Sequence, residues 1–212
     1  MKNQNNSQTK PCGFELIYYF NSLESADRET VGAVRFQAGC ELAKIFGVKG
    51  DIVAPVPNTA REVAQGYSYA SGIELCEVII ANKTLGRYFV QKTQEERERV
   101  VNEKFTYLPQ EIKGKNIVLI DDSIVRGTTT KNIIRRLREF GANKIHMLIS
   151  SPPVLSPCDK LMIASKDELI ATNKTIGQIR AQIGADTLHF LPLEIAESIY
   201  KGDRDICLEC FS

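Results

Sequence analysis

The sequence is poor in several features that mark other classes of protein. It contains no tryptophan and only two histidines, and its formal net charge is +1. A protein that binds nucleic acid would usually carry a basic excess, so this charge balance argues against a nucleic-acid partner. No run of about 18 apolar residues is present, so we expect no membrane span. The polar N-terminus MKNQNNSQTKP lacks the apolar core of a secretion signal, and we expect a cytoplasmic protein.

The cysteines raise the question of metal binding. Structural disulfides are not expected in a reducing compartment. The cysteines are therefore interpreted either as metal ligands or as ordinary core thiols. Cys207 and Cys210 form a CxxC motif, for which zinc, a redox dithiol and coincidence all remain open. Cys12 and Cys158, taken singly, fit ordinary thiols. Cys40 falls within a predicted helix and Cys76 within a predicted strand, so we interpret both as core or near-core thiols.

Apolar segments with strand and helix periodicity alternate along the chain. This alternation predicts an α/β fold with a doubly wound, mainly parallel sheet and helices on both faces. We expect a disordered polar leader over residues 1–11 and one domain over 12–212. The predicted strands cover 14–20, 52–56, 75–80, 116–120 and 145–149, and the predicted helices cover 27–46, 61–70, 128–140, 176–183 and 193–200, with a further helix opened by a capping box at Ser165.

The segment 117–130, IVLIDDSIVRGTTT, is the most informative stretch. An apolar strand runs directly into Asp121 and Asp122, whose carboxylates suit ribose hydroxyls or a hydrated Mg²⁺. The following loop ends at a helix N-terminus, where free backbone N–H groups and the helix dipole favour a phosphate. The loop adds hydroxyl donors, a cation and a glycine that allows close approach: Ser123, Ile124, Val125, Arg126, Gly127, Thr128 and Thr129. A capped helix after an acidic turn is the simpler alternative.

Several segments together resemble a known family. DDSIVRGTT resembles the phosphoribosyl-pyrophosphate motif of type I phosphoribosyltransferases, and specifically that of the glutamine phosphoribosylpyrophosphate amidotransferases of purine biosynthesis. The segment 54–73 resembles that family's pyrophosphate-binding turn and following helix. NKTLGRYFVQKTQEERER, residues 82–99, resembles its mobile catalytic loop, and 166–188 its C-terminal helical region. The resemblance covers nearly all of 12–212 and implies the type I phosphoribosyltransferase fold.

The resemblance also implies roles for residues. Asp121 and Asp122 would hold the ribose hydroxyls of 5-phosphoribosyl-1-pyrophosphate (PRPP), directly or through Mg²⁺, and the loop 123–129 would cradle its 5-phosphate. The turn Pro57, Asn58 and Thr59 would contact the pyrophosphate, with Asn58 near Mg²⁺. From the loop, Lys83 and Arg87 would neutralise the leaving pyrophosphate. On composition alone, a solvated charged loop would be the better reading of these two cations.

The sequence departs from the family in ways that leave the acceptor open. Only residues 1–11 precede the matched region, so we expect no glutaminase domain. Ammonia would then be free or supplied by a separate glutaminase subunit. The turn reads Pro-Asn-Thr-Ala where many relatives have Pro-Asp-Ser-Gly, which weakens the expected metal contact. Transfer to another amine or a nucleobase, and a non-catalytic module that senses PRPP, remain alternatives. Relatives are often dimers or tetramers, so we expect a homo-oligomer.

The resemblance favours one reading of the cysteines. One branch of the amidotransferases carries a [4Fe–4S] cluster on four cysteines, and this chain has cysteines at the matching places: Cys12, Cys158, Cys207 and Cys210. We therefore expect a structural iron–sulfur cluster, with Zn²⁺ as the alternative. It would join the start of the domain, the segment after the strand that follows the phosphate motif, and the C-terminus.

Overall fold

A four-stranded parallel sheet forms the centre of the molecule. The computed structural model describes residues 10–26, 29–82, 104–158, 164–201 and 205–212. In these residues the sheet has the strand order β3-β6-β7-β8, with every neighbouring pair parallel. The strands are β3 (Ile52–Pro55), β6 (Asn116–Asp121), β7 (Lys144–Ile149) and β8 (Thr187–Phe190). Strand β6 is apolar almost throughout because it is buried on both faces.

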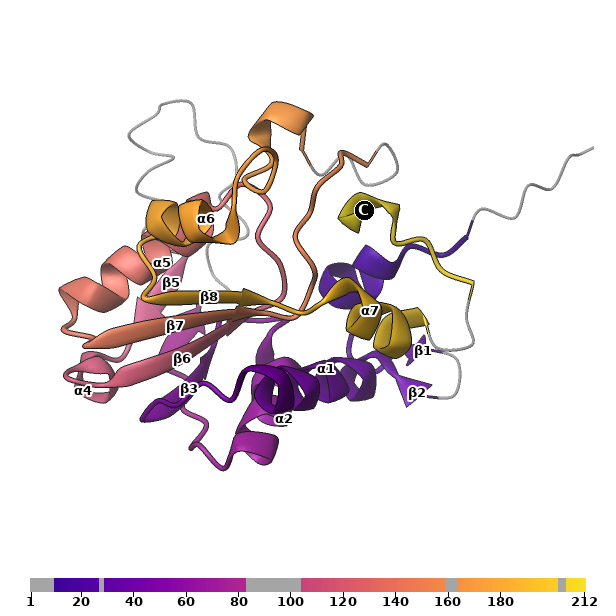
Figure 1. Cartoon of the computed structure of the whole chain (residues 1–212). Coiled ribbons are helices and arrows are strands. Elements are labelled where there is room, and N and C mark those ends of the chain that lie inside the picture. Colours follow the sequence, from indigo (N-terminus) through magenta and orange to yellow (C-terminus); the bar gives the residue numbers. More distant parts are fainter. Residues whose placement is uncertain (1–9, 27–28, 83–103, 159–163, 202–204) are drawn as a thin grey trace, which may run out of the picture.

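Helices cover both faces of this sheet (Figure 1). Helices α1 (Val31–Phe46) and α2 (Arg61–Ser71) lie on one face, and α5 (Thr128–Glu139) and α6 (Ile176–Ile183) lie on the other. Val118 packs in the hydrophobic cluster of α1 and α2, whereas its neighbour Ile117 packs in that of α5 and α6. Successive strand residues thus supply two cores, as the period of a strand requires. The predicted doubly wound α/β fold is confirmed.

Glycines allow α1 and α2 to pack closely. A Cβ atom on Gly39 would lie 1.9 Å from the carbonyl oxygen of Val63, and one on Gly66 would lie 1.9 Å from that of Phe36. Any side chain larger than hydrogen would push the helices apart. The two helices that precede the candidate site are therefore held in one close arrangement.

Short elements complete the fold. Strands β1 (Ser25–Ala26) and β2 (Glu29–Thr30) form one antiparallel pair, and β4 (Ile79–Ala81) and β5 (Phe105–Tyr107) form another. No described helix is long and apolar enough to cross a bilayer. The remaining elements are α4 (Pro109–Ile112), the 3₁₀ turns η3 (Lys166–Glu168) and η5 (Glu209–Phe211), helix α7 (Leu193–Ala196) and the π-helical turn η4 (Glu197–Lys201).

The structure corrects three expectations about local structure. The aromatic segment 14–20 was predicted as a strand, but it forms the π-helical turn η1 (Glu15–Tyr19), closed by a hydrogen bond from Phe20 N to Glu15 O of 2.9 Å. In the predicted strand 75–80, Leu75 forms only an isolated bridge, and β4 pairs with β5 outside the main sheet. The capping box at Ser165 is present, but it opens a single 3₁₀ turn.

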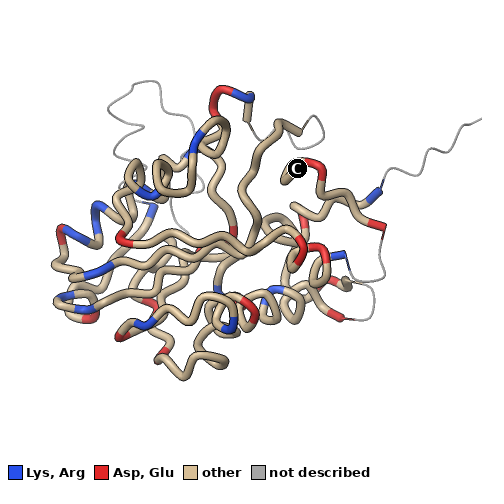
Figure 2. The backbone as a smooth tube through the Cα atoms, in the orientation of Figure 1, with Lys and Arg blue, Asp and Glu red and all other residues tan. Residues whose placement is uncertain are grey.

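Charges of both signs are interspersed along the chain (Figure 2). In this view, neither Lys and Arg nor Asp and Glu gather over one set of elements. The strands of the main sheet are largely uncharged along their buried stretches, and the charged residues lie mostly on helices and turns. This distribution agrees with the net charge of +1.

Candidate functional site

Two loops follow neighbouring strands at the same edge of the sheet. Strands β3 and β6 are parallel, with Pro55 opposite Ile120, so their carboxyl ends lie side by side. The pairing continues one residue further, where Val56 N donates to Ile120 O at 2.8 Å. The turn 57–59 follows β3, and the loop 122–127 follows β6 and leads into α5. The Pro57–Asn58 peptide bond is cis. In open α/β sheets, this edge is where ligands bind.

A cavity of about 730 Å³ opens between these loops. This volume lies within the range of small-molecule sites. Every described residue that the sequence assigned to substrate binding lines the cavity: Pro57, Asn58, Thr59, Asp121, Asp122, Ser123, Ile124, Val125, Arg126, Gly127, Thr128 and Thr129. Their individual roles stay predictions, but the structure brings all of them to one place.

The acidic pair is buried at the base of the cavity. Asp121 is 7% exposed and Asp122 is 4% exposed. Burial raises the pKa of Asp121 well above its usual range, and the neighbouring charge of Asp122 adds to this effect. Burial also raises the pKa of Asp122, although hydroxyl donors from Ser123 and Thr59 oppose the shift. Two adjacent buried carboxylates strongly favour a cation or hydroxyl donors between them.

The loop that enters α5 is supported from behind. Gly127 has a φ angle of +77°, in the left-handed region, and α5 begins at the next residue. The amide of Ile170 donates to Val125 O at 2.8 Å. Glu168 accepts a hydrogen bond of 2.9 Å from Arg126 Nε. The loop therefore has a fixed shape that directs the N-terminus of α5 toward the cavity, which suits an anion.

Other residues line the cavity without having been predicted. One wall carries Tyr18 and Tyr19 from η1 and Phe14, which lies just before it. Another wall carries Ala81, Lys104 and Phe105. The Lys104 ammonium lies 5.3 Å from the centroid of the Phe105 ring. Burial raises the pKa of Asp121, and the positive charge of Lys104 partly opposes this rise. The aromatic run 14–20 was a visible signal, but its assignment as a strand hid its role in the site.

The predicted catalytic cations cannot be placed. Lys83 and Arg87 lie in the segment 83–103, outside the described residues. Their roles stay predictions. Ala81 and Lys104, which line the cavity, lie close to the two ends of that segment.

The four cysteines assigned to the cluster come from segments that meet. The backbones of Cys12 and Cys207 pair in an isolated parallel β-bridge. Leu155 N and Ser156 N, just before Cys158, donate to Cys210 O at 2.8 and 3.2 Å. Burial raises the pKa of the Cys210 thiol to about 12, and the other three thiols add to the effect.

These contacts do not amount to a metal site. Within the described part of the chain, no group of three or more His, Cys, Asp or Glu side chains is arranged to hold a metal ion. The predicted iron–sulfur cluster and its zinc alternative are not confirmed.

Comparisons with known proteins agree with this site. Residues 33–160 match the family model described as "Phosphoribosyl transferase domain". The amidophosphoribosyltransferase of Methanothermobacter thermautotrophicus is 40% identical over 210 residues, which cover 98% of this chain and 44% of that protein. The Bacillus subtilis amidophosphoribosyltransferase is 38% identical over 207 residues, which cover 95% of this chain and 44% of that protein.

Solved structures show the same similarity. The glutamine phosphoribosylpyrophosphate amidotransferase of B. subtilis, complexed with ADP and GMP, superposes with a TM-score of 0.86 at 36% identity. The match covers 96% of this chain and 46% of that one. The chain thus spans less than half the length of each of these three relatives. The family match, together with the acidic pair and the two loops that line the cavity, shows that the chain belongs to the phosphoribosyl transferase domain family.

Proposed function

We propose that this chain transfers the phosphoribosyl group of PRPP to ammonia, forming 5-phosphoribosylamine and releasing pyrophosphate. One observation carries the proposal. A single cavity is lined by an acidic pair, by a loop that enters a helix N-terminus, and by the turn 57–59. These three groups of residues suit a sugar diol, a phosphate ester and a pyrophosphate respectively. The similarity to amidophosphoribosyltransferases supports this combination.

Mg²⁺ fits the acidic side of the cavity. Asp121 and Asp122 are both buried, and their like charges raise the free energy of the doubly ionised pair. A divalent cation bound to carboxylate and amide oxygens would remove this penalty, and the Asn58 amide lines the same cavity. When bound, the ion would neutralise charge on the pyrophosphate. We propose Asp121, Asp122 and Asn58 as the residues that face it, directly or through water.

The proposed reaction is a displacement at the anomeric carbon. The C1–O bond to pyrophosphate breaks, and the leaving group takes the electron pair. The ammonia lone pair forms the new C1–N bond, and a proton passes to solvent. In this scheme the chain holds the 5-phosphate and ribose rigidly while cations offset the charge that develops on the pyrophosphate. Lys83 and Arg87 are proposed for that last role, and Lys104 adds a described cation at the cavity wall.

Other parts of the proposal concern partners and metals. Ammonia would be free or would come from a glutaminase domain or subunit, and the chain is proposed to act as a homo-oligomer in the cytoplasm. A [4Fe–4S] cluster on Cys12, Cys158, Cys207 and Cys210 is supported by the meeting of their segments. We prefer the cluster to Zn²⁺ because the cysteines match those of the cluster-bearing branch of the amidotransferases. We assign the cluster a structural role only.

The test is pyrophosphate release from PRPP and Mg²⁺ with ammonia, glutamine or nucleobases as the acceptor. We expect release with ammonia and its loss in the Asp121→Asn/Asp122→Asn double variant. Asp51→Asn is the matched control, because Asp51 lies at the opposite edge of the sheet and accepts from Asn116 N at 2.6 Å. Release with a nucleobase but not ammonia would refute the proposed acceptor. Tight PRPP binding without turnover on any acceptor would refute catalysis and favour a sensing module.

A further inference from the structure

Arg35 is a charged side chain in the interior of the domain. It belongs to α1, and only 2% of it is exposed. Removing a guanidinium from water costs several kcal/mol unless its N–H donors find partners. Burial lowers the pKa of Arg35 below its ordinary value. A residue kept at such a cost is expected to make contacts that an apolar side chain could not.

The contacts of Arg35 lie at both ends of η1. Its Nε donates to Leu16 O and its Nη2 donates to Phe20 O, each at 2.9 Å. The last carbonyls of a helical turn lack donors within the turn, and a cation there also interacts favourably with the dipole. Arg35 therefore caps η1 from a different helix. The flat guanidinium fork joins two carbonyls four residues apart, which a lysine could not do with the same geometry.

The turn that Arg35 holds forms the aromatic wall of the cavity. Tyr18 and Tyr19 both line the cavity from η1, and Phe14 lines it just before the turn. The Phe14 and Tyr18 rings lie 5.8 Å apart, and the Tyr18 and Tyr19 rings lie 6.2 Å apart. Tyr19 is 72% exposed. Its own packing therefore does little to hold it, and its position depends on the backbone of η1.

The acidic pair lines the same cavity, at the carboxyl end of β6. Burial raises the pKa of Asp122. The positive charge of Arg35 attracts this carboxylate and, after the hydroxyl donors, partly opposes the rise. The guanidinium thus holds the backbone of the aromatic wall and also interacts with one of the acids. The loops 57–59 and 122–127, proposed to bind PRPP, line other parts of the cavity. An acceptor would therefore approach from the aromatic wall or from the wall of Ala81, Lys104 and Phe105.

We infer that Arg35 is a positioning residue, which fixes the aromatic wall of Tyr18 and Tyr19 in the cavity that Asp122 also lines, by clamping Leu16 O and Phe20 O. The identity of the ligand rests on the proposed function, but the clamp does not. Loss of the clamp should let the wall move while the phosphate-binding loops keep their shape. Approach of the acceptor should suffer more than binding of PRPP.

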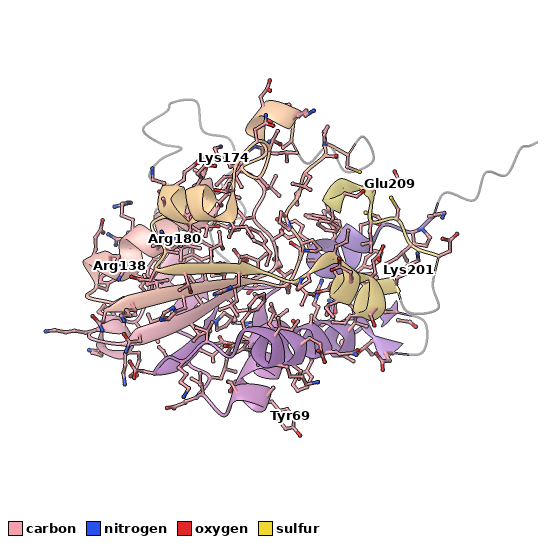
Figure 3. All side chains as sticks on the ribbon, viewed as in Figure 1. Tyr69, Arg138, Lys174, Arg180, Lys201 and Glu209 are labelled. Carbon is pink, nitrogen blue, oxygen red and sulfur yellow. The ribbon has the colours of Figure 1, made fainter. Side chains whose placement is uncertain are left out.

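A fluorescent probe can test the clamp without any ligand. The chain contains no tryptophan, so Tyr19→Trp would place a single indole on the wall. Tyr69→Trp is the matched control, because Tyr69 is 79% exposed and points outward from α2 (Figure 3). It is not among the residues that line the cavity. Quenching by acrylamide and fluorescence anisotropy would be measured for each probe with Arg35, Arg35→Lys and Arg35→Met.

At position 19, we expect quenching to rise and anisotropy to fall in the order Arg, Lys, Met. At position 69 we expect no change. Unaltered signals at position 19 in a folded Arg35→Lys or Arg35→Met protein would overturn the inference. If Arg35→Met does not fold, Arg35→Lys alone decides, because it keeps the charge and loses the fork.

Kinetics supply the second arm, on the protein without the probes. Arg35→Met should lower kcat/KM for ammonia by about tenfold or more and leave the KM for PRPP nearly unchanged. A rise in the KM for PRPP with an unchanged KM for ammonia would overturn the positioning role. If the parent protein shows no turnover, the proposed function fails, and the fluorescence arm still decides the clamp.

Discussion

The hydroxyl of Thr59 donates a hydrogen bond to Oδ2 of Asp122, which joins the turn after β3 to the loop after β6. Ser123 donates to the other oxygen of the same carboxylate at 2.6 Å. Asp122 thus has a hydroxyl donor on each oxygen, one from each of the two loops. This relationship fixes the spacing between the part of the cavity proposed for pyrophosphate and the part proposed for ribose.

Thr59→Val should weaken this junction. The substitution keeps the shape of the side chain and removes the donor, so a buried carboxylate loses one partner. We expect the free energy of unfolding to fall by about 1–3 kcal/mol, measured by urea denaturation at neutral pH. Thr59→Ser is the matched control, since it retains the hydroxyl and should stay close to the parent. A Thr59→Val protein as stable as the parent would contradict the prediction, and a loss confined to Thr59→Ser would show that the methyl group matters and the hydrogen bond does not.

Asp121 should make stability depend on pH in the ligand-free protein. Burial raises its pKa above the ordinary value of 3.8, so the folded chain keeps this proton where the unfolded chain has lost it. The folded state then binds more protons, and the free energy of unfolding falls as the pH rises from 3.8 through the raised pKa. Asp121→Asn removes this contribution, so the variant should lose less stability over that range and should be more stable than the parent above it.

The measurement is urea denaturation of both proteins from about pH 4 to pH 8, without PRPP or Mg²⁺. Asp51→Asn is the control because its carboxylate lies outside the cavity. Parallel curves for the parent and Asp121→Asn would contradict the prediction. The same variant should lose Mg²⁺-dependent binding of PRPP, which separates a gain in stability from a loss of function.

Gly127 should tolerate no side chain. Its φ angle of +77° would strain any L-residue, and an added Cβ would lie 2.4 Å from Cδ1 of Ile170. Gly72, with a φ angle of +73° and nothing within 4 Å of such a Cβ, is the matched control. We expect Gly72→Ala to cost about 1–2 kcal/mol of stability from backbone strain. Gly127→Ala should cost about 1–3 kcal/mol more from overpacking.

A second substitution checks the cause of that extra cost. Ile170→Val removes the Cδ1 atom that the new methyl group would meet, so the Gly127→Ala/Ile170→Val pair should recover part of the loss. Thermal denaturation of the four proteins forms a double-mutant cycle. Additive effects would mean that Ile170 is not the obstacle. Binding of PRPP should weaken in Gly127→Ala, because the loop that would cradle the 5-phosphate is displaced.

Much of this site could be predicted from the sequence because its signals are local. Strand β6 is one apolar run, and the residues after it are contiguous, so the loop 122–127 and the start of α5 follow directly from the sequence. The turn 57–59 follows the same logic after β3. The resemblance added the function of these loops, which their chemistry alone left open.

The rest depends on tertiary contacts. The run 14–20 has the composition of a strand, but it forms η1, whose carbonyls accept hydrogen bonds from Arg35 of another helix. Arg35 itself looks like an ordinary helix residue, and periodicity does not show that it is buried. Lys104 and Phe105 reach the cavity because β5 pairs with β4, and that pairing joins segments separated by residues 83–103. No local pattern contains this information.

The cysteines provide a test of the proposed metal. Protein purified without oxygen should be brown and contain iron and acid-labile sulfide if a [4Fe–4S] cluster is bound. Cys207→Ser should lose the colour, because Cys207 belongs to the CxxC motif and its backbone pairs with that of Cys12 in a β-bridge. Cys40→Ser and Cys76→Ser are the matched controls, and both should stay brown.

A bound cluster would join the two ends of the domain. Its removal should therefore also lower the melting temperature of the parent but not that of Cys207→Ser. A colourless parent with stoichiometric zinc would instead select the zinc alternative, and a parent free of metal whose stability is unaffected by Cys207→Ser would leave the four thiols with no metal-binding role.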